Sequence, residues 1–342
     1  MKYKNILIIR TDRIGDVLLS TPAIQAARQA FPSSRIAFMT RPYTKDIVEG
    51  NPYLDEVIIY DKDGSHRSLL ATIMFGLDLR KYKFDLAIIL HSTVRINFIA
   101  FLAGIPKRVG FARKAAFLLT DKLPYVKPSG DKHESEYNLD VVRAAGIDFD
   151  ARGFLPLLAV SKDAQIFVDN FLINNGISAK DKLVGIHPGA SCPSRIWPVK
   201  NFSKLADALA GNYGFKIIIL GVGMDFKLAE QLKANMNKDC LIIKYFTIQF
   251  TAALLKKCLF FISTDTGPAH IASAVGTPCI TIFGRKKQGL GPVRWRPLGK
   301  DNMVLHKDIG CTECMAHNCR KGFACLQATT VDEVLDVAKK FI

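Results

Sequence analysis

The chain has 342 residues, 49% of them hydrophobic and 23% charged, which is enough for two domains that each bury a core and which excludes a disordered chain. Lys and Arg number 47 against 31 Asp and Glu, so the net charge of +16 favours an anionic partner such as a nucleic acid, an anionic lipid or a diphosphate compound. The first residues lack the pattern of a signal peptide and no apolar run reaches the ~20 residues of a membrane span, so we expect a cytoplasmic protein with at most peripheral membrane contact.

Short apolar runs alternate with amphipathic stretches of helical length from the start of the chain, which is typical of repeated βα units with parallel strands. The expected strands of the first half are Asn5–Arg10, Arg35–Met39, Glu56–Tyr60, Phe84–Leu90 and Arg108–Phe111. The expected helices are Thr21–Ala30, Ser68–Arg80, Val94–Ala103 and Tyr137–Ala145. A linker near Gly153–Ser161 and a helix over residues 161–175 lead into the second half.

A second series of the same kind begins at Lys182. Its expected strands are Leu183–His187, Lys216–Leu220, Cys240–Ile243, Leu259–Ser263 and Cys279–Phe283. Its expected helices are Asn201–Asn212, Asp225–Asn235, Ile248–Lys256 and Thr266–Val275, and a long loop, Gly284–Cys325, precedes a last helix at Thr330–Phe341. The sequence therefore predicts an α/β protein of two similar domains, residues 1–158 and 159–328, followed by a C-terminal helix in residues 329–342.

The first candidate site follows the first strand, where ligands of open α/β sheets bind. Gly15 permits a tight turn, and Thr21-Pro22 is typical of a helix cap and a first helical residue. This pattern places Asp16 in the connecting turn. There Asp16 can act as a general base that deprotonates an incoming sugar hydroxyl, or it can merely cap the turn.

Two further loops lie between a strand and a helix in the second half. In His187–Pro198, backbone amides with Ser191, Ser194 and Arg195 can hold phosphate oxygens, although a plain turn is the alternative. In Ser263–His270, the free amides at the start of the next helix form an anion site, or the segment is only a capped helix start.

A dinucleotide-binding loop is disfavoured in both halves. The loop after the first strand lacks the Gly-x-Gly-x-x-Gly spacing, and Gly221-Val-Gly223 has Phe226 at the third glycine position.

Taken together, these loops resemble those of the ADP-heptose:lipopolysaccharide heptosyltransferases, glycosyltransferase family 9. The resemblance rests on residues 9–22 with Gly15-Asp16, residues 187–198 with Arg195-x-Trp197-Pro, and residues 263–270 followed by Ala274-x-Gly276-x-Pro278. The order and spacing of these passages match the family over nearly the full chain.

The resemblance implies a GT-B fold, in which two Rossmann-like domains face each other across a cleft. It also implies an inverting transfer that needs neither a metal nor a cofactor, with ADP-heptose as donor and a phosphorylated lipid, the lipopolysaccharide inner core, as acceptor. The residue roles that it implies are Asp16 as general base, Arg195 at the donor diphosphate, and Asp265, Thr266, Gly267 and His270 in the donor loop. The first half takes the acceptor, beside Gly15 and near His91 and Arg95 after the fourth strand.

The chemistry agrees with this assignment. Breaking the anomeric bond builds negative charge on the departing diphosphate, which Arg195 and helix N-termini can stabilise without a metal. The loops offer no convincing Asp-x-Asp pair for a metal, because Asp61-x-Asp63 reads as a surface turn.

Four of the eight cysteines cluster near the end of the chain, namely Cys311, Cys314, Cys319 and Cys325. Zinc or an iron–sulfur cluster is one interpretation, and reduced cysteines that stabilise a loop are the other.

Residues 95–132 hold eight Lys or Arg around the apolar Ala115–Leu119. This segment suits a phosphorylated lipid at the inner membrane surface, or it is an ordinary solvated surface. Two other functions stay open: a GT-B enzyme with a different nucleotide sugar, and a non-catalytic protein that binds polyanions. Nucleic acid is not expected, because Trp197 and Trp295 lie in Pro-flanked loops rather than on stacking platforms.

Overall fold

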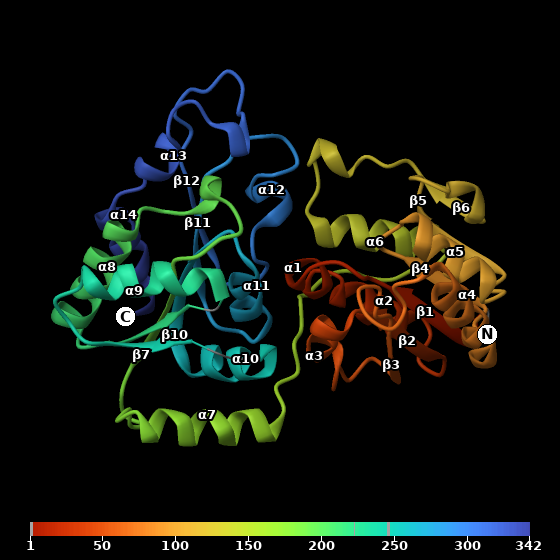
Figure 1. Cartoon of the computed structure of the whole chain (residues 1–342), viewed down its shortest axis with the longest axis horizontal. Helices are drawn as coiled ribbons and strands as arrows, with labels where there is room; N and C mark the ends of the chain where they lie inside the picture. The colour runs from red at the N-terminus through yellow and green to blue at the C-terminus, as the bar shows by residue number, and fades with distance from the viewer. Residues whose placement is uncertain (1–2, 222, 245–246) are drawn as a thin grey trace. The chain divides into compact units, whose positions relative to one another are not determined.

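The structure, a computed structural model, describes residues 3–221, 223–244 and 247–342. Contacts between residues divide the chain into two compact units, Met1–Ala159 and Val160–Ile342. Figure 1 shows that each unit is a layered α/β structure, the first coloured red to yellow-green and the second green to blue.

The first unit contains one parallel sheet of six strands in the order β3-β2-β1-β4-β5-β6. The strands are β1 (Asn5–Ile9), β2 (Arg35–Thr40), β3 (Glu56–Ile59), β4 (Leu86–Ile89), β5 (Lys107–Phe111) and β6 (Asp121–Leu123). Strand β1 pairs with both β2 and β4, so the direction of the strand order reverses there. Such a switch point leaves an opening at the carboxyl ends of the strands, where ligands of open α/β sheets bind.

Helices cover both faces of this sheet. They are α1 (Ile14–Leu18), α2 (Thr21–Ala30), α3 (Lys45–Val48), α4 (Leu69–Asp78), α5 (Val94–Leu102) and α6 (Glu134–Ala144). Successive residues of β1, Ile6 to Ile9, point to opposite faces and are all fully buried. A continuous apolar strand of this kind is what a sheet covered on both faces requires.

The second unit repeats the arrangement with the order β12-β11-β10-β7-β8-β9. Its strands are β7 (Leu183–His187), β8 (Lys216–Leu220), β9 (Cys240–Ile243), β10 (Cys258–Thr264), β11 (Cys279–Phe283) and β12 (Met303–His306). Numbered from the first strand of each unit, both sheets have the order 3-2-1-4-5-6 of a Rossmann sheet. The switch point of the second sheet therefore lies between β7 and β10.

The helices of the second unit are α7 (Lys162–Asn174), α8 (Val199–Tyr213), α9 (Phe226–Ala234), α10 (Ile248–Lys257), α11 (Gly267–Ala274), α12 (Pro292–Trp295), α13 (Ala324–Gln327) and α14 (Val331–Ala338). Helix α14 packs against α8 and contributes Val334 and Ala338 to the core of this unit. Trp197 is fully buried in the same core, and its indole N–H donates to the backbone oxygen of Thr329 at 3.0 Å.

The strands and helices expected from the sequence are all present, with ends that differ by at most three residues. The sequence reasoning missed β6 and β12, which form one edge of each sheet, and the short helices α1, α3, α12 and α13. Neither β6 nor β12 contains a buried residue, so neither carries a strong apolar pattern in the sequence. Among the described residues, no helix is long and apolar enough to cross a membrane.

Candidate active site

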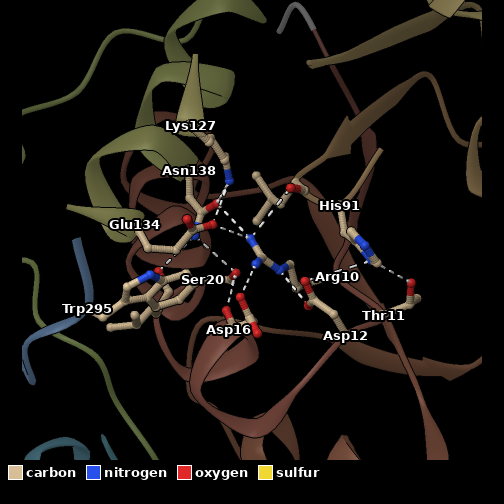
Figure 2. A network of polar contacts seen from close by, with 12 residues as sticks. Arg10, Thr11, Asp12, Asp16, Ser20, His91, Lys127, Glu134, Asn138 and Trp295 are labelled. Carbon is tan, nitrogen blue, oxygen red and sulfur yellow. Dashed lines mark hydrogen bonds and ion pairs between the residues drawn. The ribbon is translucent and has the colours of Figure 1, made fainter. Parts of the chain in front are cut away.

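Arg10, the first residue after β1, lies at the switch point of the first sheet. Its side chain is buried, and its guanidinium group contacts three carboxylates (Figure 2). Nε donates to Asp12 Oδ1 at 2.6 Å, Nη2 to Asp16 Oδ1 at 2.6 Å and Nη1 to Glu134 Oε1 at 2.9 Å. One cation therefore fixes the positions of three acids, and its planar fork does so through directed hydrogen bonds.

Helix α6 supplies the opposite side of this network. Oε1 of Glu134, a fully buried residue, also accepts a hydrogen bond from Lys127 Nζ at 2.6 Å. Asn138 Oδ1 accepts from Arg10 Nη1 at 3.0 Å, while Asn138 Nδ2 donates to the backbone oxygen of Leu19 at 3.0 Å. Buried charges need such partners, and here the partners tie α6 to the loop after β1.

Asp16 lies one residue after Gly15 in α1, so the expectation that Asp16 occupies a connecting turn is wrong. The two residues that follow it are apolar and buried, which accounts for the extra turn of helix. Helix α2 begins at Thr21 with Ser20 at the N-cap, so Thr21 is the first helical residue and not the cap. The Ser20 hydroxyl donates to the backbone oxygen of Asp16 at 2.8 Å and links the two helices.

Burial raises the pKa of Asp16 to about 6, and the neighbouring charges of Asp12 and Glu134 also favour the protonated form. Arg10 opposes these effects through its ion pair with Asp16. A carboxylate with this pKa is ionised at neutral pH and accepts a proton more readily than an ordinary aspartate. Asp16 therefore has the properties of a general base.

A pocket of about 430 Å³ lies beside this network, after β4. His91 lines it, with Nδ1 at 3.3 Å from Thr11 Oγ1, and burial together with Arg10 lowers the pKa of His91 to about 4. His91 is therefore neutral at pH 7. The cations that line the pocket are Lys62, Arg95, Arg113 and Lys114, and its described lining contains no Asp or Glu. Such a lining fits an anionic ligand.

In the second unit, Arg195 joins two of the predicted loops. It belongs to a 3-10 helix, Pro193–Arg195, after β7. Nη1 donates to the backbone oxygen of Asp265 at 2.7 Å, and Nη2 donates to the Ser191 hydroxyl. Nε donates to Cys192 Sγ at 3.3 Å. The structure thus brings together Ser191, Arg195 and Asp265, which the sequence separates by up to 74 residues.

Asp265 is buried at the end of β10, and its carboxylate forms an ion pair with Arg285. The Arg195 guanidinium lies 3.6 Å from the same oxygen. Burial raises the pKa of Asp265, and the two arginines oppose this effect. A carboxylate held in this way is suited to orienting the two arginines, which leaves their remaining N–H groups available to a ligand.

Thr266 is the N-cap residue of α11, and Gly267 is its first helical residue. Within the described part of the chain, the Thr266 side chain makes no capping hydrogen bond to the helix, because its hydroxyl bonds instead with Ser263 Oγ at 2.9 Å. A helix start without a capping side chain can offer its first amides to an anion, and the anion site stays a prediction. His270 is the fourth residue of α11 and is buried.

Ser194, also predicted to bind the nucleotide-sugar donor, has its hydroxyl engaged within the protein. It is 1% exposed, and its hydroxyl bonds with His317 Nδ1 at 3.1 Å and with Cys192 Sγ at 3.4 Å. These contacts hold the 3-10 helix that carries Arg195, so Ser194 supports the loop from within.

Sequence reasoning missed several charged residues of these networks. Glu134 lies 124 residues from Arg10, and Arg285 lies 20 residues from Asp265, so no local motif links either pair. Arg10 lies within residues 9–22, which carry the family resemblance. An arginine at a strand end, however, gives no sign in the sequence of the three acids that it binds. A long-range partner of a buried charge becomes visible only when the fold is known.

Three cysteines of the cluster lie in the loop between β12 and α13, and Cys325 lies in α13 itself. Cys311, Cys314, Cys319 and Cys325 are half-buried free thiols. Across the described residues, no group of three or more His, Cys, Asp or Glu is arranged to hold a metal ion.

A family model, that of glycosyltransferase family 9 (heptosyltransferase), matches residues 73–324. The chain is 24% identical over 330 residues to lipopolysaccharide heptosyltransferase 2 of Salmonella typhimurium, covering 93% of this chain and 90% of that protein.

Two solved structures have the same fold over nearly the whole chain. One is a glycosyl transferase family 9 protein from Veillonella parvula, with a TM-score of 0.90, 23% identity and coverage of 99% and 97% of the two chains. The other is ADP-heptose lipopolysaccharide heptosyltransferase II of Escherichia coli, with a TM-score of 0.81, 21% identity and 98% coverage of each chain. These likenesses and the two parallel sheets confirm the predicted α/β fold class, GT-B.

Proposed function

Because the chain belongs to glycosyltransferase family 9, the heptosyltransferase family, we propose that it transfers a heptose from ADP-heptose to the inner core of lipopolysaccharide. The names of its relatives support this choice of donor and acceptor. The observation that carries the proposal is Asp16, a largely buried carboxylate with a pKa of about 6 that Arg10 holds at a sheet switch point. A carboxylate in that position and state is suited to activating a hydroxyl.

In the proposed reaction, Asp16 removes the proton from the attacking hydroxyl of the acceptor while that oxygen forms a bond to the anomeric carbon. The bond from that carbon to the diphosphate breaks, and ADP leaves with the electron pair. A single displacement of this kind inverts the anomeric configuration. Asp16 acts as a base rather than as a nucleophile, so no covalent intermediate forms.

The second unit is proposed to hold the donor. Arg195 and the first amides of α11 lie at neighbouring strand ends, and Asp265 contacts the arginine. Together they offer positive charge and free N–H groups to the departing diphosphate. This arrangement supports a transfer that needs no metal ion.

The basic pocket of the first unit is proposed to receive the acceptor. Its four cations, with Arg95 at the start of α5, fit the phosphate or carboxylate groups of a phosphorylated glycolipid. Neutral His91 offers Nε2 to sugar hydroxyls, while Nδ1 bonds with Thr11. Such an acceptor is anchored in a membrane, so we propose that the enzyme works at the cytoplasmic face of the inner membrane.

A titration with ADP-heptose, ADP and UDP-glucose in EDTA tests the proposal first. Tight binding of the ADP compounds without metal is the expected result. Binding of another nucleotide sugar in their place would refute the heptose assignment, and binding of none would refute the glycosyltransferase assignment.

Two variants separate donor binding from chemistry. Asp16→Asn is expected to bind ADP-heptose normally and to lose at least about 100-fold in kcat, since it removes a general base. Arg195→Ala is expected to weaken donor binding at least about tenfold, since it removes a charge-assisted contact to the diphosphate. Near-normal turnover of Asp16→Asn, or unchanged donor affinity of Arg195→Ala, would refute the corresponding role.

A further inference from the structure

Helix α4 exposes an apolar stripe on the first unit. Leu70, Met74 and Leu77 follow the spacing of one helical face, and Leu69 lies beside them. Leu70 is 70% exposed and Met74 is 59% exposed. Large apolar side chains in such a row are unusual on the surface of a protein that has no partner.

Two neighbouring elements extend this stripe into a surface. Phe101 on α5 is exposed, and Phe117, on the 3-10 helix Ala116–Leu118, is 79% exposed. Helices α4 and α5 pack closely at Gly76, where an added Cβ would lie 2.9 Å from Leu102 Cβ. The 3-10 helix is tied to α5 because Asn97 Nδ2 donates to the backbone oxygen of Ala115 at 3.4 Å.

All three elements cover the same face of the first sheet. Their inner side chains, among them Phe75, Ile99 and Ala116, contact one core cluster that includes Leu7 and Ile89 of the sheet. The exposed residues therefore lie on the outer side of a single layer. We call this outer side of α4, α5 and the 3-10 helix Ala116–Leu118 the α4 surface.

The segments that flank the α4 surface are rich in cations, although its own three elements carry only Arg95 and Asp78. Residues 66–120 contain nine Lys or Arg against two Asp and no Glu. Both acids are engaged within the protein, because Asp78 pairs with Lys81 at 2.8 Å and Asp85 accepts from the backbone N–H of Lys4 at 2.6 Å. Lys81 is thereby paired, and Lys107 lies 3.6 Å from Asp121, but an excess of cations over acids remains. An apolar stripe flanked by such an excess is the chemistry of an interfacial membrane contact.

A second exposed apolar stripe on the same chain provides a comparison. Helix α7 exposes Ile166, Phe167 and Ile173 to a similar degree. Residues 160–181 around it contain two Lys against three Asp, so this stripe lacks the positive charge of the α4 surface. The two stripes have similar apolarity and differ in charge.

We propose that the α4 surface docks the enzyme on a bilayer of anionic phospholipid, with its apolar side chains in the interface and its cations at the headgroups. Three residues that line the basic pocket adjoin this surface, because Arg95 is on α5 and Arg113 and Lys114 shortly precede the 3-10 helix. Docking there brings the pocket close to the headgroups. This last consequence rests on the proposed function, whereas the docking itself does not.

The test is sedimentation of the full chain with vesicles of phosphatidylcholine alone or mixed with phosphatidylglycerol, all without glycolipid. The native chain is expected to bind the anionic vesicles, and to bind them more weakly at high salt. The variant Leu70→Gln/Phe117→Gln is expected to bind at least about tenfold more weakly, since it removes two large apolar side chains. Arg67→Gln is expected to weaken binding about fivefold.

The matched control is Ile166→Gln/Ile173→Gln on α7, which is expected to leave vesicle binding unchanged. All four replaced apolar residues are mostly exposed, so both double variants should fold, and far-UV circular dichroism checks this. Equal losses in the two double variants would overturn the proposal. So would a native dimer that Leu70→Gln/Phe117→Gln dissociates, because a second copy of the chain would then cover the surface.

Titration of the same variants with ADP-heptose keeps this inference apart from the proposed function. Lost vesicle binding with normal donor binding is the expected result for Leu70→Gln/Phe117→Gln. If the native chain binds anionic vesicles but not ADP-heptose, the proposed function fails and the docking surface stands. If it binds ADP-heptose but not anionic vesicles, the docking surface fails alone.

Discussion

Two neighbouring charges shift the pKa of Asp16 in opposite directions. Arg10 stabilises the ionised carboxylate, while Glu134, on the other side of the same guanidinium, favours the protonated form. Burial has the largest effect, and it raises the pKa of Asp16 to about 6. For the base role proposed for Asp16, Arg10 would be a positioning residue, and Glu134 would adjust the charge that Arg10 presents to Asp16.

This balance predicts the pH dependence of transfer. Only the ionised form of Asp16 can accept a proton, so kcat should be constant above its pKa and fall about tenfold per pH unit below about 6.

Two variants should shift this profile in opposite directions. Glu134→Gln removes a negative charge, which lowers the pKa of Asp16 and moves the acid limb of the profile to lower pH by about one unit. Arg10→Gln removes the positive charge and should move the limb to higher pH. The measurement is a pH profile of kcat for each variant.

Asp140→Asn provides the control, because Asp140 is also on α6 but pairs with Lys132 outside the network. Its acid limb should coincide with that of the native chain. Shifts of the same sign in Glu134→Gln and Arg10→Gln would contradict the opposing roles of the two charges.

At the scale of elements, the loop after β7 depends on close contact with the start of α9. A Cβ on Gly189 would lie 2.6 Å from the Cβ of Asp225, closer than real Cβ contacts. Asp225 also lies 3.6 Å from His187 Nε2, at the end of β7. The Thr264 hydroxyl donates to the Gly189 backbone oxygen at 3.1 Å and joins this loop to β10.

Gly189→Ala should therefore displace the loop that carries Arg195. We expect a loss of about 1–3 kcal/mol in the free energy of unfolding, as in other overpacked sites, together with weaker donor binding. Gly291→Ala is the matched control, since its Cβ would meet only the Arg285 backbone oxygen at 3.4 Å. Denaturant titration and ADP-heptose binding measure both effects. Equal behaviour of the two variants would show that the approach to Asp225 does not restrict the loop.

The sequence was sufficient for elements with a strong apolar period. The parallel strand Lys216–Leu220 is apolar and buried after its first residue, and its bounds were predicted without error. The short helix α1 was missed because five residues carry no resolvable period, and that omission misplaced Asp16. The loops of the site were found by their turn residues, whereas the ion pairs within them depend on contacts between distant segments.

At the scale of the whole molecule, the same strand order occurs twice, and each sheet has its own core. The residues proposed to bind the nucleotide all lie in the second unit, and those proposed to bind the acceptor lie in the first. A fold of this kind divides recognition between two separately stabilised bodies. Ligand effects on stability should therefore be confined to the unit that binds the ligand.

Tryptophan fluorescence can test this division directly. The chain has two tryptophans, Trp197 and Trp295, and both lie in the second unit. Trp197 is fully buried, so its emission should change when that unit unfolds. Far-UV circular dichroism, in contrast, reports the helices of both units.

ADP at about 100 times its Kd should stabilise the second unit by about 2.7 kcal/mol. For a unit of this size, that corresponds to a rise of roughly 5–10 °C in the midpoint of the fluorescence transition. The circular dichroism curve should separate into a part that moves with ADP and a part that stays in place. If fluorescence and circular dichroism gave one common midpoint that rose with ADP, the two units would unfold cooperatively. If ADP moved neither transition, the nucleotide site would not lie in the second unit.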